Sequence, residues 1–289
     1  MKDNFLTIIL RVRNENLFLE SFVKHYMAEG VDEIYILDDN STDPFPQYIL
    51  NHPKVFIFEA NYFKSHHEKL LDAQLLYNHV VKHKTEWVMF VDADEFITTR
   101  KNPEKTIRQE LETTFSDVDH LKIPWVQFGS NGRNKNPQNV LIDTTWRWNH
   151  DLKHPHPSNW EKGCCKYDKI EVKSIFRTSK FKELVTHCPK GAIGNVKVVD
   201  GVDKILPYED EVQIWYHNLR EENIERAYLT CNHYRTISKQ QMKQKSDDSH
   251  LPLYRINNCY ELQLQSDYSE VEDTLLKDKA IKRNYYENF

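Results

Sequence analysis

Five apolar residues, Trp87-Val88-Met89-Phe90-Val91, run directly into the acidic stretch Asp92-Ala93-Asp94-Glu95-Phe96. A short, continuous apolar run of this length is typical of a β-strand that is buried on both faces. In an extended segment, residues two apart point to the same side and lie about 7 Å from each other. The pattern therefore predicts a central strand that places Asp92 and Asp94 together at the edge of a sheet.

Outward from this strand, apolar runs alternate with helical patterns. Residues 5–12, 34–37 and 55–58 are short apolar runs and predict further strands. Between them, apolar residues recur at helical spacing from Asn14, the predicted N-cap, to Gly30, and again over residues 65–82. Strands that alternate with helices predict an α/β fold with a mostly parallel sheet.

The pattern continues in the next segment and then weakens. Pro103 predicts the first position of a helix, residues 120–128 predict a strand, and the capping box Ser269-Glu270-Val271-Glu272 predicts the start of a terminal helix. We find no repeat and no low-complexity linker. The organisation expected is one domain over 1–240, made of two halves (1–128 and 129–240), followed by a helical extension over 241–289.

Composition excludes several classes of protein. A chain of 289 residues with 12% aromatic residues is not disordered, and a net charge of −5 argues against nucleic acid as a partner. Only seven glycines are present, and neither a dinucleotide-binding nor a P-loop motif occurs. No apolar run reaches about 18 residues, so no membrane span is expected. Five cysteines without CxxC spacing, and no apolar signal segment, predict a cytoplasmic protein. Few Gly and many Asn, Lys and Ile hint at an AT-rich bacterial or viral genome.

The segments that directly follow strands are the place to look for a site, because ligands of such sheets bind at the carboxyl ends of the strands. Asp92 and Asp94 supply hard oxygen ligands that suit Mg²⁺ or Mn²⁺ better than zinc. The alternative is that one of them caps the next element and the other is solvated. A second acidic pair, Asp38-Asp39, precedes Asn40-Ser41-Thr42-Asp43. Its carboxylates could accept hydrogen bonds from a nucleotide, or they could form an Asx-turn.

These features together resemble a known group of enzymes. The segments that carry the resemblance are Arg11-Val12-Arg13-Asn14-Glu15, residues 30–43, residues 91–96, residues 125–132, Lys173-Ser174-Ile175-Phe176-Arg177 and Asn232-His233-Tyr234. In this order they resemble the family 2-like and family 92-like glycosyltransferases, which have the GT-A fold. The resemblance implies a nucleotide-sugar donor, usually UDP-linked, that is held by Mn²⁺ or Mg²⁺ on the Asp-x-Asp motif. The acceptor would be a glycan or another hydroxyl compound.

The resemblance also implies roles for individual residues. Asp39 would bind uracil with Asp38 beside it, and Asp94 would be the firmest metal ligand. The remaining donor-binding residues would be Arg11, Arg13, Gln74, Asn78 and Asp92, and the metal ligands would be Asp92, Asp94 and His233, with His187 as the alternative to His233.

Enzymes of this group invert the anomeric carbon, which requires a carboxylate as general base. The sequence leaves that base open among Asp143, Asp151, Glu161 and Asp168, because no spacing selects one of them. The aromatic residues Trp146, Trp148 and Trp160 suit an acceptor sugar, or they anchor loops.

Three other interpretations remain open at this point. A nucleotide-sugar or carbohydrate-binding module could keep the fold without turnover. A metal-dependent phosphohydrolase of the haloacid-dehalogenase kind also uses an Asp-x-Asp motif at a strand end. A zinc site could involve His150, His154, His156, Cys164 and Cys165, although their spacing fits no known zinc module.

Overall fold

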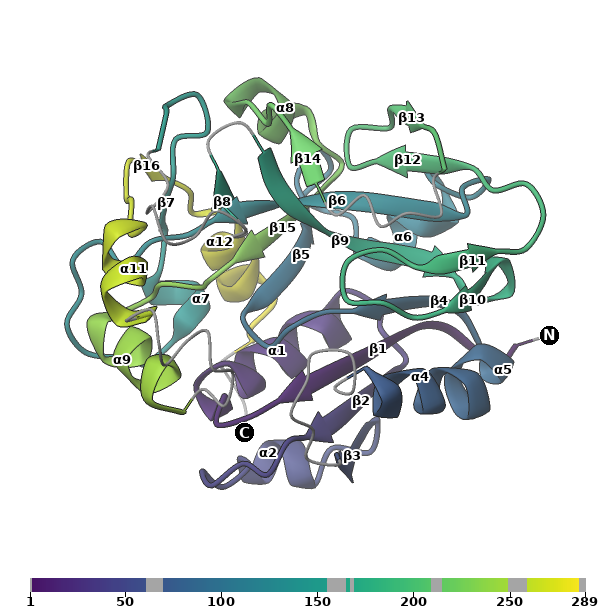
Figure 1. Cartoon of the computed structure of the whole chain (residues 1–289), viewed down its shortest axis with the longest axis horizontal. Helices are drawn as coiled ribbons and strands as arrows, with labels where there is room; N and C mark the ends of the chain where they lie inside the picture. The colour runs from purple at the N-terminus through teal and green to yellow at the C-terminus, as the bar shows by residue number, and fades with distance from the viewer. Residues whose placement is uncertain are drawn as a thin grey trace.

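The computed structural model describes residues 2–60, 70–154, 165–166, 169–208, 215–248 and 259–285 (Figure 1). The strands are β1 (Asn4–Val12), β2 (Glu33–Asp38), β3 (Val55–Glu59), β4 (Thr85–Phe90), β5 (Glu95–Thr99), β6 (His120–Gln127), β7 (Trp146–Arg147), β8 (Cys165–Lys166), β9 (Lys169–Arg177), β10 (Phe181–Glu183), β11 (Lys190–Ala192), β12 (Val198–Asp200), β13 (Ile205–Leu206), β14 (Trp215–His217), β15 (Leu229–His233) and β16 (Val271–Glu272). The helices are α1 (Asn16–Ala28), α2 (Gln47–Leu50), α4 (Leu71–Leu76) with the π-helical turn Tyr77–Val81, α5 (Lys82–Lys84), α6 (Ile107–Glu112), α7 (Val140–Asp143), the 3₁₀ turn Thr178–Lys180, α8 (Glu221–Arg226), α9 (Lys239–Asp248), α11 (Cys259–Gln265) and α12 (Leu275–Lys282).

The central sheet has the strand order β13-β12-β6-β9-β4-β1-β2-β3. The strands β3, β2, β1 and β4 are mutually parallel, and Ile8 of β1 lies opposite both Ile34 and Met89. β9 runs antiparallel to its two neighbours β4 and β6, while β12 is parallel to β6. Six of these eight strands therefore run in one direction. The prediction of an α/β fold with a mostly parallel sheet is confirmed.

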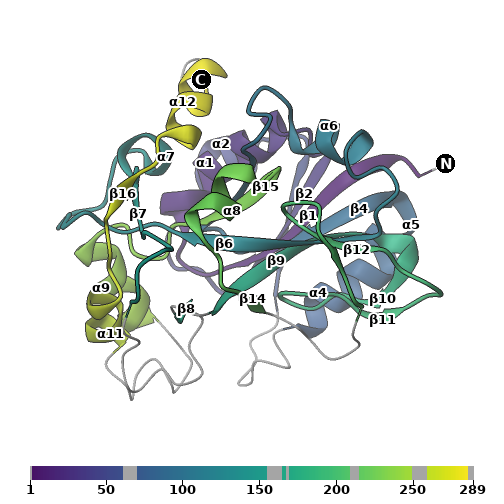
Figure 2. The same ribbon diagram turned by 90° about the horizontal axis from the view of Figure 1, so that it is seen from above.

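Helices cover both faces of the sheet (Figure 2). On one face, α1 packs its apolar stripe, which includes Phe22 and Tyr26, against Leu6, Ile8 and Leu10 of β1. On the other face, Tyr77 and Val81 pack against Ile9 of β1 and against the buried residues of β2 and β4 that point to this face. Because successive residues of a strand point to opposite faces, a strand between two helical layers must be apolar at every position. This requirement explains the continuous apolar runs of β1 and β4.

A second group of strands branches from the sheet and brings distant segments to its edge. Beyond Pro124, β6 leaves β9 and pairs with β15, which in turn pairs with β5. His233, the last residue of β15, consequently lies opposite Glu95 on one side and Gln127 on the other. This register places His233 directly beside the acidic stretch that follows β4.

Two predicted helix starts are wrong. Pro103 lies in a turn, and α6 begins at Ile107 because Thr106 and Gln109 cap each other's backbone N–H groups in a capping box. Asn14 does not cap α1, since it has a φ of 52° and its Oδ1 accepts a hydrogen bond from the Thr42 backbone N–H at 2.6 Å. Gly30 does end α1 in the left-handed conformation that the sequence predicted, with a φ of 92°.

The predicted capping box at residues 269–272 is also wrong. Val271 and Glu272 form β16, which pairs with β7, and the terminal helix α12 begins only after Thr274. The hydroxyl of Ser269 instead accepts a hydrogen bond from the backbone N–H of Asn131 at 2.9 Å. At this point, pairing with a neighbouring strand is more favourable than capping a helix with nearby side chains.

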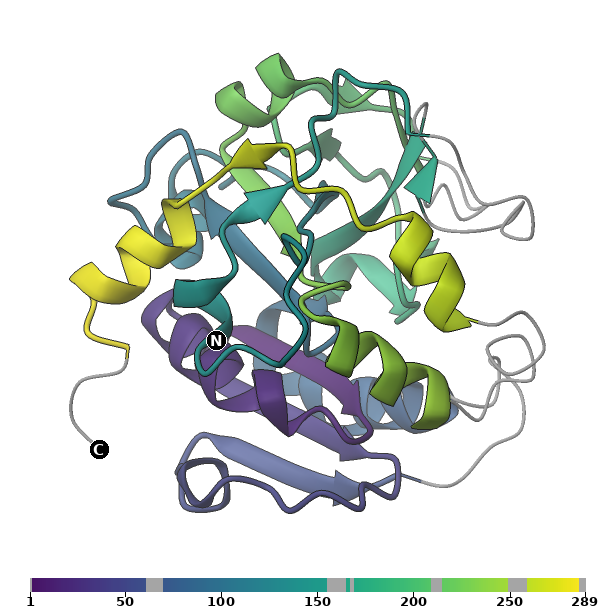
Figure 3. The same ribbon diagram turned by 90° about the vertical axis from the view of Figure 1, so that its left-hand side faces the viewer.

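The C-terminal elements spread over one side of the molecule (Figure 3). Leu276 and Ala280 of α12 are buried in the same core as α1. Across the described ranges, we find no helix that combines the length and the apolar character needed to cross a membrane.

Candidate active site

A cavity of about 440 Å³ opens at the carboxyl edge of the central strands. We call it the first cavity. It is lined by residues from ten separate stretches of chain: Arg11, Arg13, Glu15, Asp39, Phe90, Asp92, Asp94, Trp125, Glu171, Thr186, His187, His233, Arg235 and Lys245, together with Val12, Leu70 and Gln263. Five of the lining side chains are carboxylates, and they are accompanied by arginine, lysine and histidine. An open, highly charged pocket of this kind suits an ionic ligand better than an apolar one.

One part of the cavity wall is an arginine cluster that consists of Arg11, Arg13 and Asp39. The Arg11 guanidinium contacts the Asp39 carboxylate, with 3.2 Å from Nη2 to Oδ1 and 3.3 Å from Nε to Oδ2. Arg13 donates from Nη1 to the Asp39 carbonyl at 2.8 Å. Asp39 is only 4% exposed. The buried Nε of Arg13 has no hydrogen-bond partner, so this cluster keeps unused donor capacity.

The parallel pairing of β1 with β2 explains how the cluster forms. Val12 lies opposite Asp38, and the Asp39 backbone N–H donates to the Val12 carbonyl at 2.8 Å. The chain ends of two neighbouring strands are thus held together, and their polar residues meet. Asp38 itself accepts a hydrogen bond from the Ser41 N–H at 3.0 Å and does not line the cavity. Asp38 therefore forms the Asx-turn, whereas Asp39 faces the cavity.

A second part of the wall is an acidic cluster around Asp92 and Asp94. Asp94 is 3% exposed and forms an ion pair with the ammonium of Lys245 on α9. Nε2 of His233 lies 3.7 Å from Asp94 Oδ1. Burial raises the pKa of Asp94, but the charge and the hydrogen bond of Lys245, together with the neighbouring His233 and Lys173, hold that pKa well below its usual range. Burial lowers the pKa of His233 to about 3, so its imidazole is neutral.

Asp92 is supported by a buried lysine of the antiparallel strand β9. Lys173 is fully buried, and its Nζ lies 2.9 Å from Asp92 Oδ2 and 3.0 Å from Glu95 Oε2. Burial opposes ionisation of Asp92, but Lys173 outweighs burial and lowers the pKa of that carboxyl. Burial holds the pKa of Glu95 well above its usual value. The Lys173 ammonium thus contacts both carboxyl groups.

The acidic cluster fits a divalent ion that shares its coordination with a ligand. Within the described ranges, no three His, Cys, Asp or Glu side chains gather closely enough to hold an ion by themselves. Asp94 and His233 nevertheless face the cavity together, and the Lys245 ammonium already neutralises Asp94 there. His233 Nδ1 lies 3.2 Å from the Gln127 amide. With the oxygen of this amide turned toward Nδ1–H, Nε2 would carry the free lone pair that a metal ligand needs.

The structure brings six of the predicted site residues into the first cavity, and His187 joins them. The six are Arg11, Arg13, Asp39, Asp92, Asp94 and His233. His187 lies beside Glu171, with 3.8 Å between Nε2 and Oε2, rather than beside Asp94.

Other predicted residues do not line this cavity. Gln74 donates to Asn78 at 2.9 Å and accepts from the Leu184 N–H at 2.7 Å, so both side chains connect α4 to the segment after β10. Asp143 accepts from the Asn139 N–H at 2.9 Å, and Asp151 accepts from the Glu221 N–H at 3.3 Å. Both are exposed turn and cap residues. Glu161 and Asp168 lie outside the described residues.

The residues proposed for an acceptor or for zinc have structural contacts. Trp148 is 5% exposed and stacks on His154, and His154 Nε2 lies 2.7 Å from Glu270 Oε2. Trp146 of β7 lies opposite Glu272 of the antiparallel strand β16. Burial lowers the pKa of His150 to about 3. Trp160, His156 and Cys164 lie outside the described residues, as does the side chain of Cys165.

Four residues of the site were not predicted from the sequence: Glu15, Glu171, Lys173 and Lys245. Lys173 carried a signal, because it stands within a β-strand, where a buried lysine needs a carboxylate partner. Glu171 and Lys245 carried none, since nothing local connects them with the acidic stretch.

Comparison with known proteins gives a family. The family model of glycosyltransferase family 92 matches residues 13–282. No curated protein matches the chain. Among solved structures, a mannosyltransferase from Pyrobaculum calidifontis in complex with GDP-Man and Mn²⁺ is 19% identical, with 41% of this chain and 34% of that chain covered and a TM-score of 0.30.

The glucosyl-3-phosphoglycerate synthase from Mycobacterium tuberculosis, in complex with Mn²⁺, UDP-glucose and phosphoglyceric acid, is 15% identical. That match covers 62% of this chain and 58% of the other, with a TM-score of 0.32. This chain therefore spans about a third of the mannosyltransferase and about three fifths of the synthase. We base no conclusion about function on similarities this weak.

Proposed function

The chain belongs to glycosyltransferase family 92 and is a glycosyltransferase, and we propose that it transfers a sugar from a UDP-linked donor to a hydroxyl acceptor, with the aid of Mn²⁺ or Mg²⁺ and with inversion at the anomeric carbon. The earlier resemblance to this family is confirmed by the match over residues 13–282. The donor, the metal and the stereochemistry are parts of the proposal.

The observation that carries the proposal is the pairing of two unlike clusters in one cavity. The arginine cluster offers a buried donor on Arg13 that has no partner, and a buried carboxylate on Asp39 that Arg11 neutralises. A uracil ring presents an N–H flanked by two carbonyl oxygens, so it can use both. The acidic cluster offers Asp94 and His233, which suit an ion that binds a diphosphate. Together the two clusters match the two ends of a UDP-sugar.

The transfer breaks the bond between the anomeric carbon and the diphosphate oxygen, through a transition state with oxocarbenium character. Negative charge develops on the leaving UDP. Asp92, Asp94 and His233 would hold the divalent ion, which when bound acts as a Lewis acid on the phosphate oxygens. The guanidinium of Arg11 and the side chain of Arg235, which both line the cavity, add positive charge to the same space.

Lys245 and Lys173 have separate parts in this arrangement. Lys173 is fully buried behind Asp92 and keeps that carboxylate ionised. Lys245 is partly exposed and neutralises Asp94. Asp94 would hold the divalent ion, which would supply the neutralising charge, and the Lys245 ammonium would then be able to contact the diphosphate.

A binding experiment tests the proposal. Thermal unfolding of the protein with UDP, GDP, UDP-glucose, UDP-galactose and UDP-N-acetylglucosamine should be measured with and without Mn²⁺. A ligand at 100 times its Kd stabilises the fold by about 2.7 kcal/mol. We expect UDP compounds to raise Tm, with a larger shift when Mn²⁺ is present, and we expect slow release of UDP from one UDP-sugar.

Two variants sharpen the result. Asp94→Asn should remove the effect of Mn²⁺, whereas Glu183→Gln, at an exposed position of β10, should behave as the wild type. Stabilisation by UDP without turnover of any UDP-sugar would favour a binding module. Stabilisation by GDP alone would overturn the choice of donor.

A further inference from the structure

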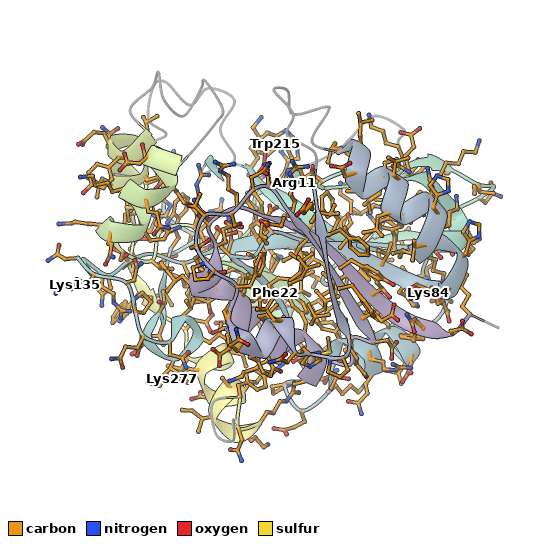
Figure 4. All side chains as sticks on the ribbon, turned by 90° about the horizontal axis from the view of Figure 1, so that it is seen from below. Arg11, Phe22, Lys84, Lys135, Trp215 and Lys277 are labelled. Atoms are coloured by element: carbon orange, nitrogen blue, oxygen red, sulfur yellow. The ribbon has the colours of Figure 1, made fainter. Side chains whose placement is uncertain are left out.

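A second cavity of about 520 Å³ lies next to the start of β9. Its wall includes the whole of β14, that is Trp215, Tyr216 and His217, together with Asp200 of β12 and the loop residues Lys204 and Asn218. Figure 4 shows Trp215 at the same edge of the molecule as Arg11, which lines the first cavity. Nothing in the proposed function has so far used this second space.

The lining of the second cavity suits a ligand rich in hydroxyl groups. The face of a tryptophan packs against the apolar C–H side of a sugar ring, and carboxylates and amides bind hydroxyls. Tyr216 donates to Asp200 Oδ2 at 3.3 Å, which fixes both side chains in the wall. Lys169 lies over the Trp215 ring, 4.4 Å from its centroid, and holds the orientation of that ring. A volume of several hundred cubic ångströms is that of a typical small-ligand site.

The two cavities meet at one pair of residues. Trp215 of β14 lies directly opposite Glu171 of the antiparallel strand β9. Residues opposite each other on paired strands point to the same side, with Cβ atoms about 5 Å apart. Trp215 lines the second cavity and Glu171 lines the first. A carboxylate therefore stands at the boundary between the two spaces.

Glu171 lies beside His187 in the wall of the first cavity. His187 donates from Nδ1–H to the Val172 carbonyl at 2.9 Å, so its Nε2 is directed toward the Glu171 carboxylate, 3.8 Å away. Asp39 faces Arg11, Asp92 faces Lys173, and Asp94 faces Lys245. These three carboxylates belong to the arginine cluster and the acidic cluster, which we propose hold the donor.

We propose that the second cavity binds the pyranose ring of the acceptor and that Glu171, at its boundary with the first cavity, is the general base. This inference rests on the proposed function. The Glu171 carboxylate takes the proton of the acceptor hydroxyl as that oxygen forms its bond to the anomeric carbon. The bond from the anomeric carbon to the diphosphate oxygen breaks, and its electron pair leaves with UDP. Glu171 then returns the proton to water.

The first test is Glu171→Gln, which keeps the shape of the side chain and removes the base. Water can replace the acceptor, so release of UDP from the UDP-sugar that binds the wild type is the readout. General-base catalysis contributes about 10²–10⁴-fold, and we expect a fall of at least about 100-fold with UDP affinity unchanged. Glu171→Asp should keep part of the rate. The control is again Glu183→Gln, with wild-type rates.

The second test is Trp215→Ala, measured by saturation-transfer NMR with methyl glycosides of glucose, galactose, mannose and N-acetylglucosamine. We expect at least one glycoside to bind the wild type and Glu171→Gln, and to bind Trp215→Ala about 10-fold more weakly. Binding that is equal in Trp215→Ala and the wild type, or no glycoside binding at all, would overturn the acceptor site.

The outcomes separate this inference from the proposed function. If the wild type releases UDP and Glu171→Gln releases it equally fast, the general base is wrong and the UDP-dependent transfer stands. If the wild type binds no UDP compound, the proposed function fails and the general base fails with it.

Discussion

In both clusters of the first cavity, cationic side chains neutralise carboxylates, but these cations come from very different parts of the chain. In the arginine cluster, Asp39 is neutralised by Arg11, 28 residues earlier, on the neighbouring parallel strand. In the acidic cluster, Asp92 depends on Lys173, 81 residues later, and Asp94 depends on Lys245, 151 residues later. The first cluster is a local product of one strand–helix–strand unit, whereas the second exists only when the whole chain has folded. The acidic cluster should therefore be the more sensitive of the two, both in stability and in catalysis.

The strongest way to break the acidic cluster is Lys173→Met. Because Lys173 is fully buried between Asp92 and Glu95, its loss leaves two neighbouring carboxyls without a cation. Removing one partner of a buried pair costs about 3–5 kcal/mol, and we expect a loss of about that size in urea unfolding. Lys135→Met, at an exposed position, should cost less than about 0.5 kcal/mol. A similar cost for both variants would contradict the structural role of Lys173.

The second largest effect is expected on catalysis, in the variant Asp94→Asn. The amide cannot bind a divalent ion as a carboxylate does, so charge on the leaving UDP is less well stabilised. We expect release of UDP to fall about 100-fold, which corresponds to about 2.7 kcal/mol. Asp117→Asn, in an exposed ion pair with Lys197, should leave the rate unchanged. A rate in Asp94→Asn within threefold of the wild type would rule out Asp94 as the metal ligand.

The pH dependence of stability gives a third measurement. Burial, together with the charges of Asp94 and Asp92, raises the pKa of Glu15 to about 8 against the opposing effect of Lys245. The folded protein thus keeps the proton that the unfolded chain loses near pH 4.5. This contribution to stability is complete below pH 4.5 and is lost as the pH rises to about 8, by at most about 1.4 kcal/mol per pH unit.

Glu15→Gln removes this titration. Urea unfolding at several values between pH 5 and pH 8 should show a stability curve that is flatter than that of the wild type over this interval. Identical slopes in the two proteins would mean that Glu15 is ionised in the folded state.

The smallest effect is expected in the arginine cluster. Asp39→Asn replaces the charged acceptor by an amide, and we expect UDP affinity to fall about 10-fold, or about 1.4 kcal/mol. Asp38→Asn is the matched control, because an asparagine oxygen can still accept from the Ser41 N–H in the turn. Titration calorimetry with UDP distinguishes them. If Asp38→Asn weakened UDP binding as much as Asp39→Asn, the division of roles between the two aspartates would be wrong.

Much of the fold could be predicted because the central strands β1, β2 and β4 are buried on both faces. The apolar runs that became β1, β2, β3 and β4 were visible in the sequence, and Gly30 ended its helix as expected. The failures occurred where a distant partner competed with a local signal. Ser269 bonds to Asn131 instead of capping a helix, and Asn14 bonds to the segment after β2.

In the site too, the residues signalled by the local sequence were predicted, and those that depend on distant partners were not. The polar ends of β1, β2 and β4 pointed to Arg11, Asp39 and Asp94, all of which line the cavity. Gln74 and Asn78 do not line the first cavity, because Gln74 bonds to Asn78 and to the backbone of Leu184 after β10. Glu171 could not be found, since its place depends on the departure of β6 from β9 and on the arrival of β14 in its stead.

The sequence by itself determined the layered α/β fold and the delivery of acidic residues to the strand ends, because hydrophobic burial and strand alternation act over a few neighbouring residues. Only the tertiary structure decided which cation faces each carboxylate and which glutamate stands between the two cavities. Electrostatic partners act through space, and a lysine 151 residues away in the chain becomes the nearest charge to Asp94 only after α9 has packed against the sheet edge.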